Sequence, residues 1–182
     1  MTRAVEKPKT PVICDVELPQ DRALRRTGER LIGAVTDLPL RYAPFFARLA
    51  QLWEAPEELV VSELTRANDP RCWQRSLLPG LRTFDLRLGP GGERGRARLL
   101  RFAPGARFPK HRHHGSESVL VLEGSYADGE GREVGPGQLQ TMPGGSEHEL
   151  VILGPTPCIA AVSERGLEFT GPLLRWASKL LG

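Results

Sequence analysis

The chain of 182 residues contains four histidines, and all of them lie between positions 111 and 148. His111 and His113 are two residues apart, so on a β-strand both imidazoles point to the same face and can reach one point. Glu117 comes soon after a glycine that lets the chain turn, and His148 follows the turn sequence Pro143-Gly144-Gly145. Three imidazoles and one carboxylate suit a divalent metal such as Zn, Fe(II), Mn, Ni or Co, and they leave positions open for water or a substrate.

A solvated surface group is the ordinary role of a histidine. His114 fits that role, because its parity on a strand points it away from His111 and His113. The other three histidines all fall in strand segments flanked by turns. If they were surface groups as well, this shared placement would be a coincidence in a chain with so few histidines. The spacing therefore favours a metal site formed by His111, His113, Glu117 and His148.

The elements that must position these residues change type along the chain. From about residue 81, short alternating segments are separated by Gly or Pro, which predicts a β-sandwich or β-barrel. The predicted strands cover residues 83–88, 94–98, 108–113, 117–126, 137–142, 148–153 and 158–163. Three parts are expected: an extended arm plus helices over 1–72, the barrel over 73–171 and a short C-terminal helix over 172–182.

The first part carries the helical signals. An amphipathic pattern predicts a helix over residues 21–35, Pro44 can open a second helix, and Pro56 can open a third over 57–67. An apolar stripe on the second helix is typical of a helix that packs against its own barrel, and a partner-binding face is the alternative. This stripe comprises Phe45, Phe46, Leu49 and Trp53.

Composition excludes several classes of protein. The chain has 25 Lys and Arg and 22 Asp and Glu, evenly spread, which argues against a nucleic-acid-binding module. No CxxC pair exists among its three cysteines, so neither a sulfur zinc knuckle nor a dithiol redox motif is expected. The longest apolar run, residues 158–162, is far too short for a membrane span, and the N-terminus has no secretory signal. We expect a cytoplasmic protein with no nucleic-acid or membrane partner.

Two stretches of the sequence carry a longer pattern. The first reads Gly105-x5-His111-x-His113-x3-Glu117-x6-Gly124, and the second reads Gly137-x5-Pro143-x-Gly145-x2-His148. Both resemble the two motifs of the cupin superfamily, although Ile152 stands where the second motif ends with Asn. The resemblance implies a mainly β fold, a jelly-roll barrel of the RmlC-like type. It also implies that one metal ion is held inside the barrel by His111, His113, Glu117 and His148.

A narrower resemblance covers residues 73–170. The run over residues 99–128 and the downstream Pro-Gly-Gly-x2-His are similar to the C-terminal cupin domain of ChrR-type anti-sigma factors. In that family a helical N-terminal domain binds zinc through His and Cys and grips an extracytoplasmic-function sigma factor. Here residues 1–75 contain no His and only Cys14 and Cys72, so that zinc motif is absent and a sigma-factor partner is not favoured.

Three functions remain open. The first is a regulatory or sensing module that binds a small-molecule ligand, or responds to oxidants through its metal. The second, implied by related bacterial cupins, is a non-haem Fe(II) dioxygenase that cleaves diketones or hydroxylated aromatic ketones. In the third the metal is structural. Zinc is the first choice of metal, with Fe(II), Mn and Ni as alternatives, and a homodimer formed through sheet edges is expected.

The pocket beside the metal is harder to assign from sequence. We predict that it is lined by Arg101, Phe108, Val119, Val121 and Met142, with barrel-filling core as the alternative for the apolar residues. The alternating Arg94, Arg96 and Arg98 are expected on the solvated face of an outer strand, and Arg101, out of step with them, is expected to point inward. No catalytic acid–base pair can be assigned.

Overall fold

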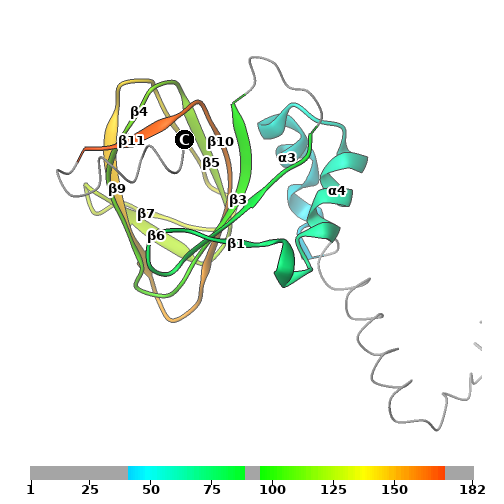
Figure 1. Ribbon diagram of the computed structural model, residues 1–182, viewed down its shortest axis with the longest axis horizontal. Coiled ribbons are helices and arrows are strands. Elements are labelled where there is room, and N and C mark those ends of the chain that lie inside the picture. Colours follow the sequence, from blue (N-terminus) through cyan, green and yellow to red (C-terminus); the bar gives the residue numbers. More distant parts are fainter. Residues whose placement is uncertain (1–40, 89–94, 171–182) are drawn as a thin grey trace, which may run out of the picture. The chain divides into compact units, whose positions relative to one another are not determined.

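A computed structural model describes residues 41–88 and 95–170 of the chain (Figure 1), and all of these residues belong to one compact unit. The arm over 1–20 and the helices predicted over 21–35 and 172–182 lie outside the described residues. The boundary predicted between residues 72 and 73 stays a prediction.

In residues 41–88, two α-helices and two short 3-10 helices come before the first strands. They are η1 (Ala43–Phe45), α3 (Phe46–Trp53), α4 (Glu57–Arg66) and η2 (Pro70–Cys72). Helix α4 has Pro56 at its N-cap, and its first turn carries two glutamates that interact favourably with the positive end of the helix dipole. Within the described residues, no helix is both long enough and apolar enough to span a membrane.

The strands form two antiparallel sheets, one of six strands and one of five. The six-stranded sheet has the order β1-β2-β3-β10-β5-β8, with β1 (Gln74–Arg75), β2 (Leu81–Asp85), β3 (Arg96–Phe102), β10 (Cys158–Glu164), β5 (Glu117–Glu123) and β8 (Leu139–Met142). The five-stranded sheet has the order β11-β4-β9-β6-β7, with β11 (Leu167–Phe169), β4 (Arg107–His113), β9 (Glu147–Leu153), β6 (Ser125–Asp128) and β7 (Glu133–Val134). The two sheets close on each other as the predicted jelly-roll barrel (Figure 1).

The predicted strand over 117–126 is divided in two at Gly124. This glycine has a φ of 64°, in the left-handed region that favours glycine, and a Cβ there would lie 2.5 Å from the carbonyl oxygen of Pro157. Only a glycine allows the chain to pass this close to Pro157, and at this point the chain leaves the six-stranded sheet after β5 and enters the other sheet as β6. A strand pattern read from alternation alone does not reveal this change of sheet.

Two apolar cores share the six-stranded sheet. The barrel core lies between the two sheets and includes Phe102, Phe108 and Val162. The helix-side core lies on the outer face of the six-stranded sheet, where Leu49 and Trp53 of α3 pack with Leu99 of β3. The apolar stripe of α3 thus packs against the chain's own barrel, which confirms that interpretation of the stripe.

Polar contacts fix the helices to the same sheet. The indole Nε1 of Trp53 donates a hydrogen bond of 3.1 Å to the carbonyl oxygen of Val162 in β10. The hydroxyl of Tyr42 donates to Glu123 at the end of β5, and Arg41 forms an ion pair with the same carboxylate at 2.7 Å. Helix α4 is fixed to the same sheet by Arg66, whose Nη2 donates a hydrogen bond of 2.7 Å to the carbonyl oxygen of Asp85 in β2. Both helices lie beside the outer face of the barrel (Figure 1).

Candidate metal centre

The four predicted metal ligands come together inside the barrel. His111 and His113 lie on β4 and His148 on β9 of the five-stranded sheet, whereas Glu117 begins β5 of the facing sheet. One possible ligand atom from each of the four lies within 4.8 Å of those from the others. The structure thus brings together all four residues that the motifs singled out, from three strands and both sheets.

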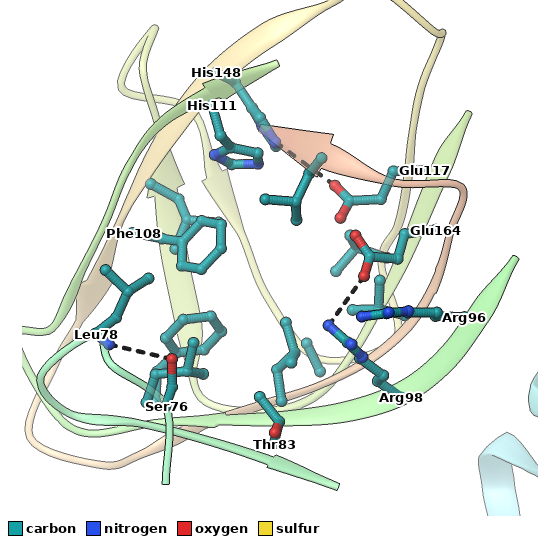
Figure 2. A pocket seen from close by; sticks show the side chains of 18 of the residues that line it. Ser76, Leu78, Thr83, Arg96, Arg98, Phe108, His111, Glu117, His148 and Glu164 are labelled. Atoms are coloured by element: carbon teal, nitrogen blue, oxygen red, sulfur yellow. Dashed lines mark hydrogen bonds and ion pairs between the residues drawn. The ribbon is translucent and has the colours of Figure 1, made fainter. Parts of the chain in front are cut away.

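The contacts within the cluster are short and face inward. The Nε2 atoms of His113 and His148 are 2.9 Å apart, and each lies close to Oε2 of Glu117, at 3.4 and 3.6 Å. His111, His113 and Glu117 are buried, and His148 is partly exposed. Figure 2 shows His111 and His148 reaching across the barrel toward Glu117.

Hydrogen bonding and burial prepare the imidazoles to act as ligands. Nδ1 of His111 lies 2.9 Å from the carbonyl oxygen of Pro109, so it carries the proton and leaves Nε2 with a free lone pair. Burial lowers the pKa of His111 to about 4 and also lowers the pKa of His113, so both rings stay neutral near pH 7. Neutral imidazoles converging on a carboxylate are a donor set that fits a divalent metal ion.

The metal-free protein is expected to lose stability as the pH falls from about 6.5 toward 4. In this range the unfolded chain binds a proton at residue 111, with an ordinary pKa of 6.5, while folded His111 stays neutral. Protonation therefore favours the unfolded state, by about 2 kcal/mol at pH 5 from this group alone. Urea unfolding in EDTA at pH 7.5 and pH 5.0 measures the effect.

The matched control for this experiment is His111→Gln, which has no group to titrate at that position. Its free energy of unfolding should change less between the two pH values than that of the native protein. An equal loss in both proteins would contradict the assignment of the effect to His111.

The metal cluster opens into a cavity of about 730 Å³ inside the barrel. His111, Glu117 and His148 line this cavity, the two histidines from one sheet and the glutamate from the other. Much of the remaining lining is apolar and comes from both sheets, including Leu78, Leu81, Leu100, Phe102, Phe108, Val119, Leu150, Ala160, Val162 and Phe169. This volume is within the range of cavities that accept small-molecule ligands.

A second polar group lines the same cavity. Arg98 of β3 lies between two carboxylates: its Nε is 2.8 Å from Oδ1 of Asp85, and its Nη1 is 3.1 Å from Oε1 of Glu164. Glu164, the last residue of β10, is buried, and its carboxylate faces the cavity beside Glu117 (Figure 2). Burial raises the pKa of Glu164 although Arg98 acts in the opposite direction.

The predicted lining residues fall into two groups. Phe108 and Val119 line the cavity, whereas Val121 and Met142 are buried in the barrel core without lining it. The prediction for Arg101 needs correction, because this side chain is exposed and does not line the cavity.

The correction at Arg101 follows from the parity of β3. Leu100 and Phe102 face the barrel interior, so Leu99 and Arg101, which alternate with them along the strand, face outward. Arg96 and Arg98 share the parity of Leu100 and both line the cavity, where Arg98 is partly buried and Arg96 is exposed. Alternation showed which arginines share a face, but not which face is inside.

The cysteines of the described residues are not in disulfides. Cys158 is completely buried in the barrel core, and burial raises the pKa of its thiol to about 12. A thiol of this kind is inert near neutral pH, as expected for a cysteine within an apolar strand segment.

The closed jelly roll with a buried cluster of three histidines and one glutamate defines a cupin. The family model described as the ChrR cupin-like domain matches residues 64–167. The chain belongs to this ChrR cupin-like family.

Solved structures with similar folds extend the comparison. The crystal structure of Rhodobacter sphaeroides SigE in complex with the anti-sigma ChrR is 29% identical over 78% of this chain and 76% of that chain, with a TM-score of 0.51. KdgF from Halomonas sp. is 24% identical over 51% of this chain and 86% of its own, with a TM-score of 0.43. The polyketide cyclase RemF from Streptomyces resistomycificus is 27% identical over 50% and 69%, with a TM-score of 0.41. No curated protein sequence matches the chain.

Proposed function

We propose that the chain is a metal-dependent sensing module, in which a metal ion held by His111, His113, Glu117 and His148 binds a small molecule inside the barrel. The main support is the cavity of about 730 Å³ into which the cluster opens. A metal with only a structural role needs a closed set of ligands and no space for a further molecule. When bound, the metal supplies open coordination positions and Lewis acidity.

In this proposal, ligand binding in the cavity changes the position of helix α3. Ala160 and Val162 of β10 line the cavity, and the carbonyl of Val162 accepts the hydrogen bond of Trp53 from α3 on the other side of the sheet. A ligand that displaces β10 therefore also displaces α3. This direct contact is the physical basis for a signal from the cavity to the outer surface.

A sigma factor is the first protein partner to test. ChrR is bound to SigE in the R. sphaeroides structure, and the likeness to that structure covers 78% of this chain. The absence of histidine from residues 1–75 means that such a partner would be bound without the zinc site predicted for the N-terminal domain of the family.

A non-haem Fe(II) dioxygenase is the second candidate function. The apolar cavity beside the metal cluster supports it, because such an enzyme needs room for an organic substrate and for oxygen at the metal. Three histidines and a glutamate form a borderline donor set that accepts Zn, Fe(II), Mn or Ni. Zinc is the metal expected for the sensor, and iron is the metal expected for the oxygenase.

Anaerobic purification, elemental analysis and an oxygen-uptake screen with diketones decide between the two functions. Stoichiometric zinc without oxygen uptake supports the sensor and excludes the oxygenase. Iron with substrate-dependent oxygen uptake excludes the sensor. Absence of any stoichiometric metal from protein refolded with each ion in turn would exclude both.

We also propose that the chain is cytoplasmic and that it forms a homodimer through the edges of its sheets. Strand β8 is an edge of the six-stranded sheet, and it carries Leu139, whose side chain is 54% exposed. Pairing of edge strands between two copies would cover this residue and satisfy the free backbone groups of the edge.

A further inference from the structure

A groove lies on the outer face of the six-stranded sheet, beside helix α3. This outer groove has a volume of about 710 Å³, and among the described residues it shares only Arg96 and Arg98 with the lining of the barrel cavity. Its charged lining consists of four arginines and two acidic residues: Arg48, Arg96, Arg98, Arg165, Glu54 and Asp85. Asp85 is already paired with Arg98. The outer groove therefore carries a net positive charge, which favours an anionic ligand.

Serine hydroxyls line part of the outer groove next to one of these arginines. Ser163 of β10 is directly paired with Ser118 of β5, so the Cβ atoms of the two residues are about 5 Å apart. Ser116 and Arg165 lie one residue beyond the ends of these two strands, and they line the same groove. Three hydroxyls and one guanidinium therefore come from neighbouring strands, and all four groups can donate hydrogen bonds.

The aliphatic part of the Arg165 side chain is confined by glycines from both neighbouring segments. A Cβ at Gly115 would lie 2.6 Å from Cβ of Arg165, and a Cβ at Gly95 would lie 2.9 Å from its Cγ. The backbone N–H of Gly115 also donates a hydrogen bond of 3.1 Å to the carbonyl oxygen of Arg165. Because its stem is already confined, Arg165 loses less conformational entropy on binding a ligand than an unconfined surface arginine does.

The guanidinium of Arg165 is exposed and uncommitted. Within the described residues its side chain makes no hydrogen bond or ion pair, and neither do the hydroxyls of Ser116 and Ser163. A phosphate group fits such donors, because it carries close to two negative charges at pH 8 and presents several oxygens that accept hydrogen bonds. Arginine is also the side chain whose donors best match the geometry of phosphate oxygens.

We propose that the outer groove is a second binding site of the protein, and that Arg165, Ser116, Ser118 and Ser163 bind the phosphate group of a small molecule there. Inorganic phosphate and phosphate monoesters both present this group. The organic part of a monoester lies along the apolar lining of the groove, which includes Leu52, Leu86, Leu88 and Leu120. The site requires no metal ion and is separate from the metal centre.

The test measures binding to the full-length protein by isothermal titration calorimetry at pH 8 and constant ionic strength. Phenyl phosphate is compared with benzenesulfonate, which has nearly the same shape but one negative charge fewer. We expect phenyl phosphate to bind at least about fivefold more tightly. A third titration, with inorganic phosphate, identifies the source of the group: equal affinity assigns the site to the free ion, and weaker affinity assigns it to an ester.

Three variants assign the binding to this groove. Arg165→Gln should weaken the binding of phenyl phosphate at least about tenfold, because it removes the charged donor. Ser163→Ala should weaken it by about threefold, as expected for one neutral hydrogen bond. The matched control is Arg107→Gln, which removes the same charge from an exposed arginine of β4 that lines neither the groove nor the cavity. Its affinity should stay within about twofold of the native value, and circular dichroism should show that all three variants are folded.

Several results would overturn this inference. Phosphate bound at the metal centre would bind equally well to Arg165→Gln, since Arg165 does not line the barrel cavity. An equal loss in Arg165→Gln and Arg107→Gln would show a general attraction to the positive charge of the protein rather than a site. Absence of measurable binding of both phosphate compounds to the native protein would contradict the inference directly, without bearing on the metal centre.

Discussion

Replacement of His111 and His148 together by alanine is expected to abolish stoichiometric metal binding. The two residues come from adjacent strands of the five-stranded sheet, and their ring centroids are 4.4 Å apart. Without them only His113 and Glu117 remain, and two ligands do not hold a metal ion at this kind of site. Elemental analysis after dialysis should show at least about a tenfold loss of bound metal, since loss of a single supporting group already has effects of that size.

The control for this experiment is His114→Ala, which removes an imidazole from the same segment. His114 is exposed and is not among the clustered ligand atoms. Its metal content should equal that of the native protein. Unchanged metal in the double variant, or an equal loss in the control, would refute the assignment of the site.

Replacement of Trp53 by alanine is expected to lower the free energy of unfolding of the whole described unit by about 3–5 kcal/mol. The indole is 3% exposed in the helix-side core and donates to the carbonyl of Val162. Removal of the ring leaves a cavity between α3 and the six-stranded sheet and an unpaired carbonyl in β10. Urea unfolding followed by far-ultraviolet circular dichroism measures the loss.

Graded and matched variants complete this test. Trp53→Phe keeps most of the ring but removes the donor, so it should cost less than the alanine variant. Gln51→Ala changes an exposed residue on the same helix and should have an effect within about 0.5 kcal/mol. Two separate unfolding transitions, with the barrel transition unaffected by Trp53→Ala, would show that helices and barrel do not share a core.

The metal ligands could be predicted from sequence because their geometry is set locally. Residues two apart on a strand, such as His111 and His113, share a face whatever the rest of the fold does. Glu117 and His148 were recognised through the spacing of two motifs that include the turn glycines. The structure adds their distances and burial, which depend on how the two sheets face each other.

The second polar group of the cavity could not be predicted in the same way. The strand expected over 158–163 ends one residue before Glu164, which the observed strand β10 includes. Alternation shows which arginines of β3 share a face, but the choice of the inner face is made by long-range packing. A signal was present, because Glu164 continues the alternation of Cys158, Ala160 and Val162.

The placement of β10 between two cores also limits how its sequence can vary. Cys158, Ala160, Val162 and Glu164 are buried toward the barrel, while Ala161 is buried among the helices, and none of the seven residues of the strand is exposed. A larger side chain at Ala160 or Ala161 has no solvent into which it can be diverted. A library of random substitutions across the chain should therefore return its fewest folded members at β10, and ligand specificity should be easier to redesign from β3 and β11 than from this strand.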